Sequence, residues 1–508
     1  MRELPKGWTT SFLNDFCSAV GGGTPSKSEP KYWVGGTIPW VSPKDMKTRV
    51  VIDSEDHVTE AALDRLSIVP PDSVLVVVRS GILSRTLPVA QTTIPVTVNQ
   101  DMRAFVPHTG IAASFLAWQL LAKEREILHA CSKQGTTVAS IEGPAFASFP
   151  VAVAPVAEQS RIVAKLEELL SDLDAGVAEL KAAQKKLTQY RQSLLKAAVE
   201  GALTAEWRQH NHPTETGAQL LEHILTERRT RWEARQLAKF EEQGKTPPKD
   251  WQKKYPEPVQ PDTAELQELP EGWVWASLDQ LSEFITSGSR SWANYYVSSG
   301  AIFIRSQNIN RDWLDMTDIA FVDPPPSSEG ARTRVRMDDL LLTITGANVG
   351  KTARVTVDVD EAYVSQHVAL IRMIEARVAE YLHLFLTASA GGRGQLDKAA
   401  YGAGKPGLNL QQVAEVAVPL PSMREIRALM EKVLTHFYST RSQEVAITTS
   451  LHQSTAQRQN ILRAAFSGQL VPQDPDDEPA SMLLERIRSE RAAQEITKPL
   501  YKRGKKRR

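Results

Sequence analysis

The chain has 508 residues, of which 42% are hydrophobic and 24% charged, so we expect several globular domains with ample cores. Its 60 basic and 60 acidic residues give zero net charge, which offers no compositional sign of a nucleic-acid binder. Only two cysteines occur, Cys17 and Cys131, which excludes a disulfide scaffold and a Cys-rich zinc site and fits a reducing cytoplasm.

Residues 1–157 alternate Val, Ile, Thr and aromatic segments with Gly, Pro and Ser turns, which predicts an α+β domain. Within it, residues 72–78 indicate an acidic turn into a strand, and 149–155 indicate a short strand stopped by proline. The longest apolar run of the chain, 74–78, is far shorter than the ~20 residues of a membrane span. The N-terminus has no apolar signal segment, so we expect a cytoplasmic protein.

A long helix is predicted next, in a coiled-coil segment spanning residues 158–204. Between residue 158 and Gly201 there is no proline and one glycine, Gly176. Leucine recurs at every seventh position, the pattern of a coiled-coil seam, at Leu166, Leu173, Leu180, Leu187 and Leu194. Gly201 stands where a helix C-cap belongs. A helix of this length rises ~65 Å, which is too long to be buried in one small domain.

Residues 205–265 are predicted to connect this helix to the rest of the chain. The alternating charges of 218–242 are typical of a helix with a solvated face. The prolines between residues 245 and 258 indicate an extended linker.

Residues 266–421 repeat the first domain at a period near 266. Three blocks return in order: 3–8 as 268–273, 191–201 as 458–468, and 220–224 as 483–487. Because each match keeps nearly the same offset, we interpret the chain as two copies of one α+β unit. The loops between the matched blocks differ. That difference fits two recognition modules for different ligands, or drift after duplication.

A second coiled-coil helix is predicted within 422–471, with a weaker apolar stripe at Val433, Ile447, Leu451 and Ile461. The two long helices most simply pair antiparallel and separate the two globular units with pseudo-twofold symmetry. An intermolecular coil is the alternative. Residues 472–508 would form a C-terminal helix and a tail whose last eleven residues hold seven basic side chains. That tail could touch DNA phosphates or serve for solubility.

Three motifs of catalytic or cofactor-binding proteins are incomplete. The segment 346–352 resembles a phosphate-binding loop but has three residues between its glycines instead of four. Residues 323–326 lack the aromatic of an amino-methyltransferase motif. Gly402, Gly404 and Gly407 lack the strand and helix of a dinucleotide-binding site. The ten histidines are scattered, so we predict a chain without catalytic residues, metal or cofactor of its own.

With these features the chain resembles the specificity (S) subunit of type I restriction-modification systems over essentially its whole length. The residues that carry the resemblance are the Leu-Pro-x-Gly-Trp openings at Leu4 and Leu269, the run from Pro155 through Gln159 to Ile162, and the helix endings at 197–203 and 464–470. The second copy departs at the middle motif, because residues 421–426 do not repeat the glutamine.

The resemblance implies a role in phage defence. Each α+β unit would be a target recognition domain that reads one half of a bipartite, asymmetric double-stranded DNA site, and the paired helices would set the spacer. Two modification (M) subunits would dock on the chain and carry S-adenosylmethionine for adenine methylation. Restriction (R) subunits would join through M and supply cleavage with ATP and Mg. This chain would choose the sequence and perform no chemistry.

Polar and basic side chains in the Gly/Ser-rich loops are the candidates for contacts to base edges and phosphates. In the first domain they are Thr24, Ser26, Lys27, Lys44, Arg79, Ser80, Arg85, Gln100, Lys133 and Gln134. In the second domain they are Ser289, Arg290, Arg305, Gln307, Asn308, Asn348, Lys351, Gln366, His367 and Lys405.

The charge balance of the two domains opposes DNA binding by the chain alone. Residues 1–157 hold 14 basic and 14 acidic side chains, and residues 266–421 hold 13 and 18. We therefore expect weak DNA affinity for the isolated chain, and tight, sequence-specific binding with M bound. The alternative from another class is a coiled-coil scaffold or adaptor without sequence-specific DNA binding. It explains the helices but not two domains with divergent loops.

Overall fold

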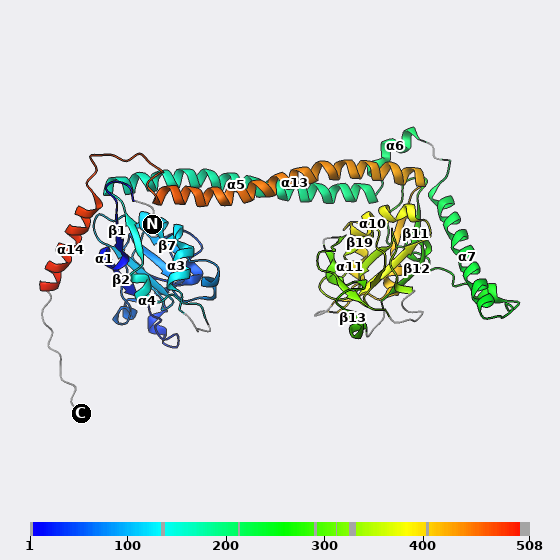
Figure 1. The fold of residues 1–508 in the computed structure, drawn as a ribbon, viewed down its shortest axis with the longest axis horizontal. Coiled ribbons are helices and arrows are strands. Elements are labelled where there is room, and N and C mark those ends of the chain that lie inside the picture. Colours follow the sequence, from blue (N-terminus) through cyan, green and yellow to red (C-terminus); the bar gives the residue numbers. More distant parts are fainter. Residues whose placement is uncertain are drawn as a thin grey trace, which may run out of the picture. The chain divides into compact units, whose positions relative to one another are not determined.

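The computed structural model describes residues 4–133, 138–211, 214–288, 292–310, 312–324, 332–402 and 406–497. The chain divides into two compact units, Met1–Lys181 with Thr448–Arg508, and Ala182–Ile447. Each unit joins a body of strands and short helices to part of two long helices (Figure 1). The fold is therefore mixed helix and sheet, as the sequence predicts.

The body of the first unit contains a five-stranded sheet, a three-stranded sheet and one closing strand pair. The first sheet has the order β2 (Cys17–Gly21), β9 (Met102–Pro107), β6 (Ser73–Val77), β7 (Val89–Thr92) and β4 (Val50–Val51). The second has the order β5 (Asp56–Val58), β3 (Ile38–Val41) and β8 (Thr97–Val98), and the closing pair is β1 (Thr9–Phe12) with β10 (Pro150–Val153). The short helices are α1 (Leu13–Phe16), α2 (Ala113–Ala122), α3 (Glu124–Cys131) and α4 (Gly143–Ala147).

The central strand β6 shows why this sequence forms a sheet buried on both sides. Val74 and Val76 enter one hydrophobic cluster, whereas Leu75 and Val77 enter another. Strand side chains alternate between faces, so an unbroken apolar run predicts burial on both. Asp72, just before the strand, has a left-handed φ of 56°, and this accounts for the predicted acidic turn.

The body of the second unit contains two four-stranded sheets and two strand pairs. The sheets are β12 (Ser282–Ser287), β21 (Val368–Met373), β18 (Leu340–Thr343), β19 (Thr352–Arg354), and β13 (Tyr296–Val297), β17 (Ala320–Val322), β14 (Ala301–Ile304), β20 (Ala362–Val364). The pairs are β15 (Ile309–Asn310) with β16 (Trp313–Leu314), and β11 (Val274–Ser277) with β22 (Ala417–Leu420). The short helices are α8 (Leu278–Leu281), α10 (Ala379–Thr387), α11 (Gly392–Ala399) and α12 (Leu410–Ala414).

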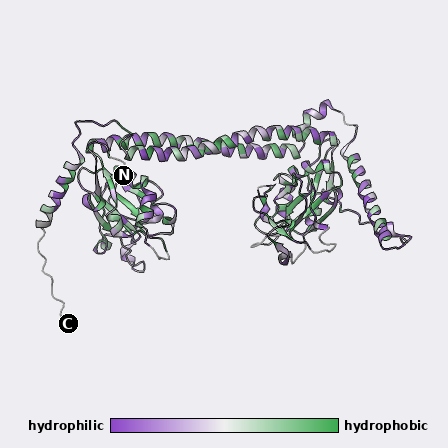
Figure 2. Ribbon diagram, in the orientation of Figure 1, coloured by the Kyte–Doolittle hydropathy of each residue, from purple (hydrophilic) through white to green (hydrophobic). Residues whose placement is uncertain are grey.

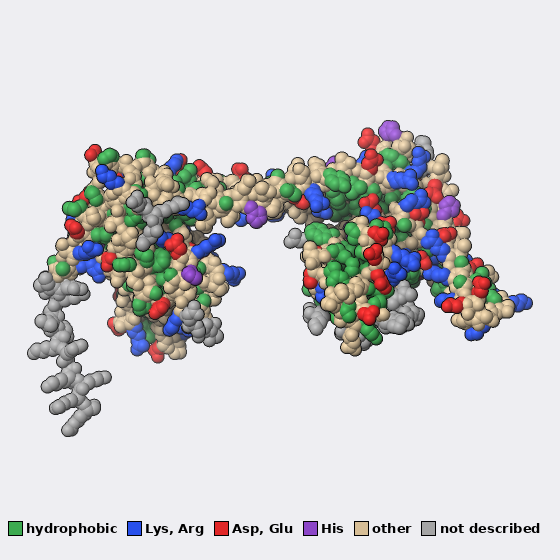
Figure 3. All heavy atoms as spheres, viewed as in Figure 1, with side chains coloured by type: hydrophobic (Ala, Val, Ile, Leu, Met, Phe, Trp, Pro, Cys, Tyr) green, Lys and Arg blue, Asp and Glu red, His purple; other side chains and the backbone are tan. Residues whose placement is uncertain are grey.

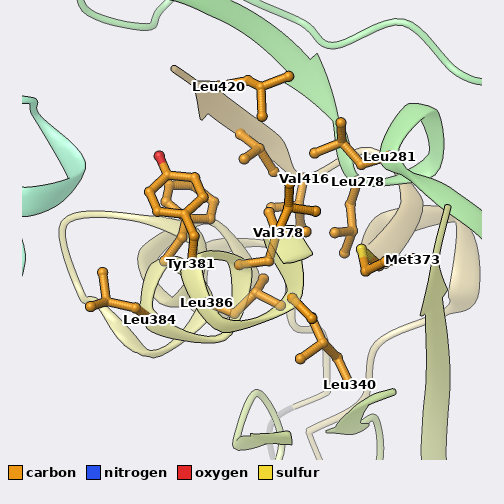
Figure 4. Close-up of a cluster of buried hydrophobic side chains, with 14 of the residues drawn as sticks. Leu278, Leu281, Leu340, Met373, Val378, Tyr381, Leu384, Leu386, Val416 and Leu420 are labelled. Atoms are coloured by element: carbon orange, nitrogen blue, oxygen red, sulfur yellow. The ribbon is translucent and has the colours of Figure 1, made fainter. Parts of the chain in front are cut away.

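The main core of the second unit lies between its sheet and helix α10. Leu340 and Leu342 of β18 point into this core, where Tyr381 of α10 is fully buried (Figure 4). Leu341 points to the opposite face and a separate cluster. Asp338, with a φ of 65°, begins the strand as Asp72 begins β6.

Each body is tied to the start of a long helix by the tryptophan of its opening motif. Trp8 donates its indole N–H to Oε2 of Glu158 at 2.9 Å, and Trp273 donates to Oε2 of Glu425 at 2.9 Å. Both carboxylates are buried in the first turns of helices α5 (Val156–Val199) and α13 (Met423–Phe466). These contacts give the two Leu-Pro-x-Gly-Trp sequences the same structural role.

The long helices have 44 residues each and pair in an antiparallel sense. In the first unit the start of α5 packs on the end of α13, with Leu166 in one cluster with Ile461. In the second unit the end of α5 packs on the start of α13, with Ala198 in one cluster with Val433. Gly201 and Gly468 follow the helix ends with φ of 73° and 70°, the left-handed geometry of a C-cap.

The predicted seam residues are the less exposed positions of these helices. Leu166, Leu194, Val433 and Ile461 are buried, and Leu173, Leu180, Leu187, Ile447 and Leu451 are half-buried. Figure 2 shows hydrophobic and hydrophilic residues interleaved along both helices, as a two-helix seam requires.

Two further helices each dock on a globular body. In the first unit, α14 (Ala480–Thr497) begins where the N–H of Ala480 donates to the carbonyl of Gly7 at 2.8 Å. In the second unit, α7 (Gly217–Glu242) begins where the N–H of Gly217 donates to the carbonyl of Gly272 at 2.8 Å. The short helix α6 (Ala205–His210) precedes α7.

The first half of α7 docks on the second body along one face, and the positions on its other face are exposed, as the alternating charges predict. Leu220, Ile224 and Arg228 are buried against the second body because they recur every fourth residue on one face. Among the helices that the structure describes, none is long and apolar enough to cross a membrane.

Candidate functional site

Loops from four separate parts of the chain meet at one end of the first body, and we call them the first loop cluster. They are residues 22–28, 78–80, 99–101 and, among the described residues, 132–133 with 138–141. The N–H of Val78 donates to the carbonyl of Asp101 at 2.8 Å, and the N–H of Ser80 donates to that of Ala139 at 3.0 Å. These bonds bring Arg79, Ser80, Gln100 and Lys133 to one place, although they are far apart in sequence.

Gly22 sets the position of the glycine-rich loop. A Cβ at Gly22 would lie 1.8 Å from the carbonyl oxygen of Asn99, so only glycine allows this approach. Two residues further on, the Thr24 hydroxyl hydrogen-bonds to Oε1 of Gln100. The loop that presents Ser26 and Lys27 is therefore held against the turn that presents Gln100.

The basic residues of the first body differ in how far their charge is available. Lys27, Arg79, Arg85 and Lys133 are exposed and have no acidic partner within 4 Å among the described residues. Lys44 instead lies 2.9 Å from Glu55 and 2.9 Å from Asp56. The hydrogen bond that Lys44 donates to Glu55, followed by the one that it donates to Asp56, raises the pKa of its ammonium group, so its charge is already balanced.

The second body has a second loop cluster at the corresponding positions: residues 288, 344–350, 365–367 and, among the described residues, 401–402 with 406–407. A Cβ at Gly288 would lie 2.0 Å from the carbonyl oxygen of Val364, so Gly288 makes the approach that Gly22 makes. The N–H of Ile344 donates to the carbonyl of His367 at 2.9 Å, and Thr345 pairs with Gly407 in an isolated bridge. In both clusters a glutamine stands in the turn after a strand that pairs in parallel, β8 with β3 and β20 with β14.

The exposed side chains of the second cluster form a polar group. The Thr345 hydroxyl lies 2.8 Å from Nδ1 of His367, and Nε2 of Gln366 lies 3.2 Å from Nε2 of the same ring. Gln134, Ser289, Arg290 and Lys405, which the sequence also nominates, lie outside the described residues.

Two further candidates of the second body, Arg305 and Gln307, form a separate group around Asp318. Arg305 lies 3.4 Å from its carboxylate, and Nε2 of Gln307 donates to it at 2.7 Å. Asn348 donates to the carbonyl of Ser306 at 3.2 Å and accepts from Nζ of Lys351 at 2.9 Å. Arg305 and Gln307 therefore bind the loop of Asp318, and Asn348 links Lys351 to the backbone at Ser306.

The expectation that Asn308 contacts DNA does not hold. Its side chain is 2% exposed, and its amide nitrogen donates to the carbonyls of Asp315 and Asp318. Its amide oxygen accepts from the N–H of Arg305. Asn308 therefore shapes the turn and has no polar atom left for a base.

Sequence reasoning missed Gly22, Gly288 and Thr345 as parts of the clusters. A glycine in each opening loop was visible, but the peptide that it approaches lies more than 70 residues away in sequence. Thr345 follows strand β18 by two residues, as Arg79 follows β6, and this shared spacing was the available signal.

The described residues give no sign of catalytic or metal chemistry. Residues 346–351 form the turn between the antiparallel strands β18 and β19, so they do not lead from a strand into a helix as a phosphate-binding loop does. Among the residues that the structure describes, no group of three His, Cys, Asp or Glu could hold a metal ion. On the face that Figure 3 shows, basic and acidic side chains are interspersed on both bodies.

Comparisons with known proteins show which family this chain resembles. A family model described as the type I restriction modification DNA specificity domain matches residues 5–184. The chain is 39% identical over 193 residues to the EcoR124I/EcoR124II specificity subunit of Escherichia coli, covering 37% of this chain and 47% of that protein. It is 25% identical over 355 residues to the EcoBI specificity subunit of Escherichia coli, covering 67% of this chain and 64% of that protein.

These matches span less than two thirds of the length of those two relatives. A solved chain from work on complex assembly and conformational transition of the type I R-M system covers 92% of this chain and 100% of its own length, with a TM-score of 0.64 and 16% identity. At that identity the likeness concerns the fold. Together the comparisons confirm the resemblance drawn from the sequence.

Proposed function

The chain belongs to the specificity subunits of type I restriction-modification systems, and on that premise we propose that it selects a bipartite DNA site with one loop cluster for each half. The chain itself performs no chemistry. Residues 1–157 and 266–421 are the two target recognition domains, and 158–204 and 422–471 form the spacer helices with pseudo-twofold symmetry. Residues 205–265 connect them, and 472–508 complete the chain.

The observation that carries this proposal is that the two loop clusters share a frame but not their side chains. In each, a glycine approaches a distant peptide, and a glutamine follows a parallel strand. Arg79 and Lys133 are exposed in the first cluster, whereas Thr345 and His367 occupy the second. Base edges are distinguished by such differences in donors and acceptors, so two unlike clusters support two unlike half-sites.

Within this proposal the exposed cluster residues read bases or hold phosphates. In the first domain these are Thr24, Ser26, Lys27, Arg79, Ser80, Arg85, Gln100 and Lys133, together with Gln134. In the second they are Gln366 and His367, together with Ser289, Arg290 and Lys405, and the Asp318 group supplies Arg305 and Gln307. The fixed length of the long helices would set the spacer, since a 44-residue helix rises about 66 Å.

The proposed assembly supplies the chemistry that this chain lacks. Two M subunits would dock on the chain, bring S-adenosylmethionine and methylate adenine in the selected site. R subunits would join through M and use ATP and Mg to translocate and cleave DNA.

The test is a genome-wide map of adenine methylation after co-expression of this chain with its neighbouring M subunit. We expect a two-part methylated motif with a fixed gap, and its loss when this chain is deleted. Replacing residues 266–421 with those of a relative should change one half of the motif and leave the other. If a competent M subunit gives no methylation that depends on this chain, the specificity role is wrong and a scaffold role replaces it.

A further inference from the structure

The second half of α7 and the chain that returns from it form an arm, residues 229–255, which projects from the body of the second unit (Figure 1). The helix ends at Glu242, and Gly244 takes a left-handed φ of 61°. The N–H of Lys245 then donates to the carbonyl of Phe240 at 2.8 Å, which turns the chain back along the helix.

The arm is a folded hairpin, because aromatic side chains of the returning chain pack against α7. Trp232 of α7 stacks on Trp251 of the returning chain, with ring centroids 5.8 Å apart and 19° between planes. Tyr255 meets the edge of Trp232 at 5.4 Å, and its hydroxyl accepts from Arg228 at 2.8 Å. The expectation of a purely extended linker over 245–258 is therefore wrong for this stretch.

The surface of the arm is strongly basic. Residues 229–255 hold eight Lys and Arg and four Asp and Glu. Most of the arginines have carboxylate partners, such as Arg235 with Glu283 at 2.7 Å. Lys239, Lys249 and Lys254 are exposed, and among the described residues none of them has an acidic partner within 4 Å; Lys245 contacts only the neutral amide of Gln243.

We propose that this arm binds the phosphate backbone of DNA outside the recognition sequence. The inference rests on the proposed function, since it presumes that the second unit is placed on DNA. The body that carries the arm has a net charge of minus five between residues 266 and 421, whereas the arm has an excess of four positive charges. The arm thus supplies neutralisation that the recognition domain itself lacks.

The chemistry of the arm favours a nucleic-acid backbone over an acidic protein surface. Protein interfaces are enriched in exposed aromatic side chains and depleted in lysine. In the arm the tryptophans stack internally, and the exposed residues include Lys239, Lys249 and Lys254. Flexible ammonium groups act as point charges that suit phosphates of any sequence.

The test measures binding of a long fluorescent duplex of arbitrary sequence to the full chain in complex with its M subunit, over a range of salt concentrations. The variant is Lys245→Gln/Lys249→Gln/Lys254→Gln, and the matched control is Lys181→Gln/Lys185→Gln/Lys186→Gln on α5. We expect the arm variant alone to lower the slope of log K against log salt by roughly 2–3 and to weaken binding about tenfold at moderate salt.

Trp251→Ala should produce a similar loss, because it removes the stack that holds the returning lysines. Unchanged affinity in both arm variants overturns the proposal. So does an equal loss in the control, which indicates general charge, or loss of M binding alone, which indicates a protein partner. The methylation map distinguishes failure of the proposed function, because the arm variants should methylate the same two-part motif as the unaltered chain.

Discussion

At the scale of single residues, each loop cluster requires a glycine at one position, because a Cβ atom would not fit there. Gly22 and Gly288 each face a carbonyl oxygen at a distance that a Cβ cannot occupy. Gly21 directly precedes Gly22 in the sequence, and a Cβ added at Gly21 would have no other atom within 4 Å. The chain therefore contains adjacent glycines of which one is required for the cluster and one is not.

We predict that Gly22→Ala separates the loop of Thr24 from the turn of Gln100. The substitution should lower stability by about 1–2 kcal/mol and slow methylation of the target on the order of tenfold in the complex with M. Gly21→Ala is the matched control and should leave both quantities unchanged. Thermal unfolding and the methylation rate provide the measurements, and equal effects of the two substitutions would contradict this account.

A half-buried histidine makes the second unit sensitive to acid. Nε2 of His383 donates to the carbonyls of Asp312 and Thr352 at 3.0 and 3.1 Å. Burial lowers the pKa of His383 below its usual 6.5, although both carbonyls oppose this. The unfolded chain takes up a proton near pH 6.5 and the folded chain does not. The contribution of neutral His383 to the free energy of unfolding is therefore complete above pH 6.5. It is lost as the pH falls from 6.5 through the lowered pKa of His383 in the folded chain.

We expect the unfolding temperature of the protein to fall between pH 7 and pH 5, and His383→Gln to make this fall smaller. Glutamine retains an N–H donor for the two carbonyls but cannot be protonated. Circular dichroism melts at the two pH values measure the effect. An identical pH dependence in the variant would assign the acid sensitivity to other groups.

At the scale of elements, the long helices are held by a narrow seam. Leu187 of α5 lies beside Ala446 and Ile447 of α13 in a shallow apolar groove. Gln184, one turn earlier, is exposed. Hydrophobic contact on this one face explains why the heptad of leucines, and not helix propensity alone, specifies the pair.

Leu187→Asp should therefore destabilise the helix pair by about 1–2 kcal/mol, because it removes half-buried apolar surface and places a charge in the seam. Gln184→Asp changes the exposed face and should stay within ~0.5 kcal/mol of the unaltered chain. The melting of the helical signal tests both. Comparable losses in the two variants would mean that charge, and not the seam, is what matters.

The charge pattern of residues 218–242 predicts a solvated helix face but does not reveal that another face of the same helix is buried. Its polar residues outnumber the apolar ones, which is typical of a solvated helix. Three residues at a spacing of four, Leu220, Ile224 and Arg228, are nevertheless enough to bury one stripe. Arg228 is accommodated because it donates to the carbonyl of Ser282 and to the hydroxyl of Tyr255.

At the scale of the whole molecule, charge is distributed so that neither residues 1–157 nor residues 266–421 carry an excess of basic side chains. Phosphate binding then requires local lysines and arginines and a partner that adds more. We predict weak, strongly salt-dependent binding of DNA by the isolated chain and tight, sequence-specific binding with M present. Fluorescence anisotropy on the methylated motif, with and without M, measures the difference. Equally tight binding by the chain alone would contradict the prediction.

The sequence by itself determined what is local. The heptad of leucines predicted α5 to within two residues at each end, the glycines Gly201 and Gly468 marked the helix ends, and the apolar run 74–78 marked β6. These features follow from side-chain periodicity and backbone preference over a few residues. The Leu-Pro-x-Gly-Trp openings, the run from Pro155 to Ile162 and the helix endings carried the resemblance to type I specificity subunits.

Only the tertiary structure decided which distant segments meet. It brought Thr24 to Gln100, buried Asn308 within its own turn, and closed the arm by stacking Trp232 on Trp251. It also placed the charged helix α7 against the second body, where Leu220 and Ile224 are buried. The physical reason is that such contacts depend on complementary surfaces from remote parts of the chain, and periodicity within one segment carries no information about its partner.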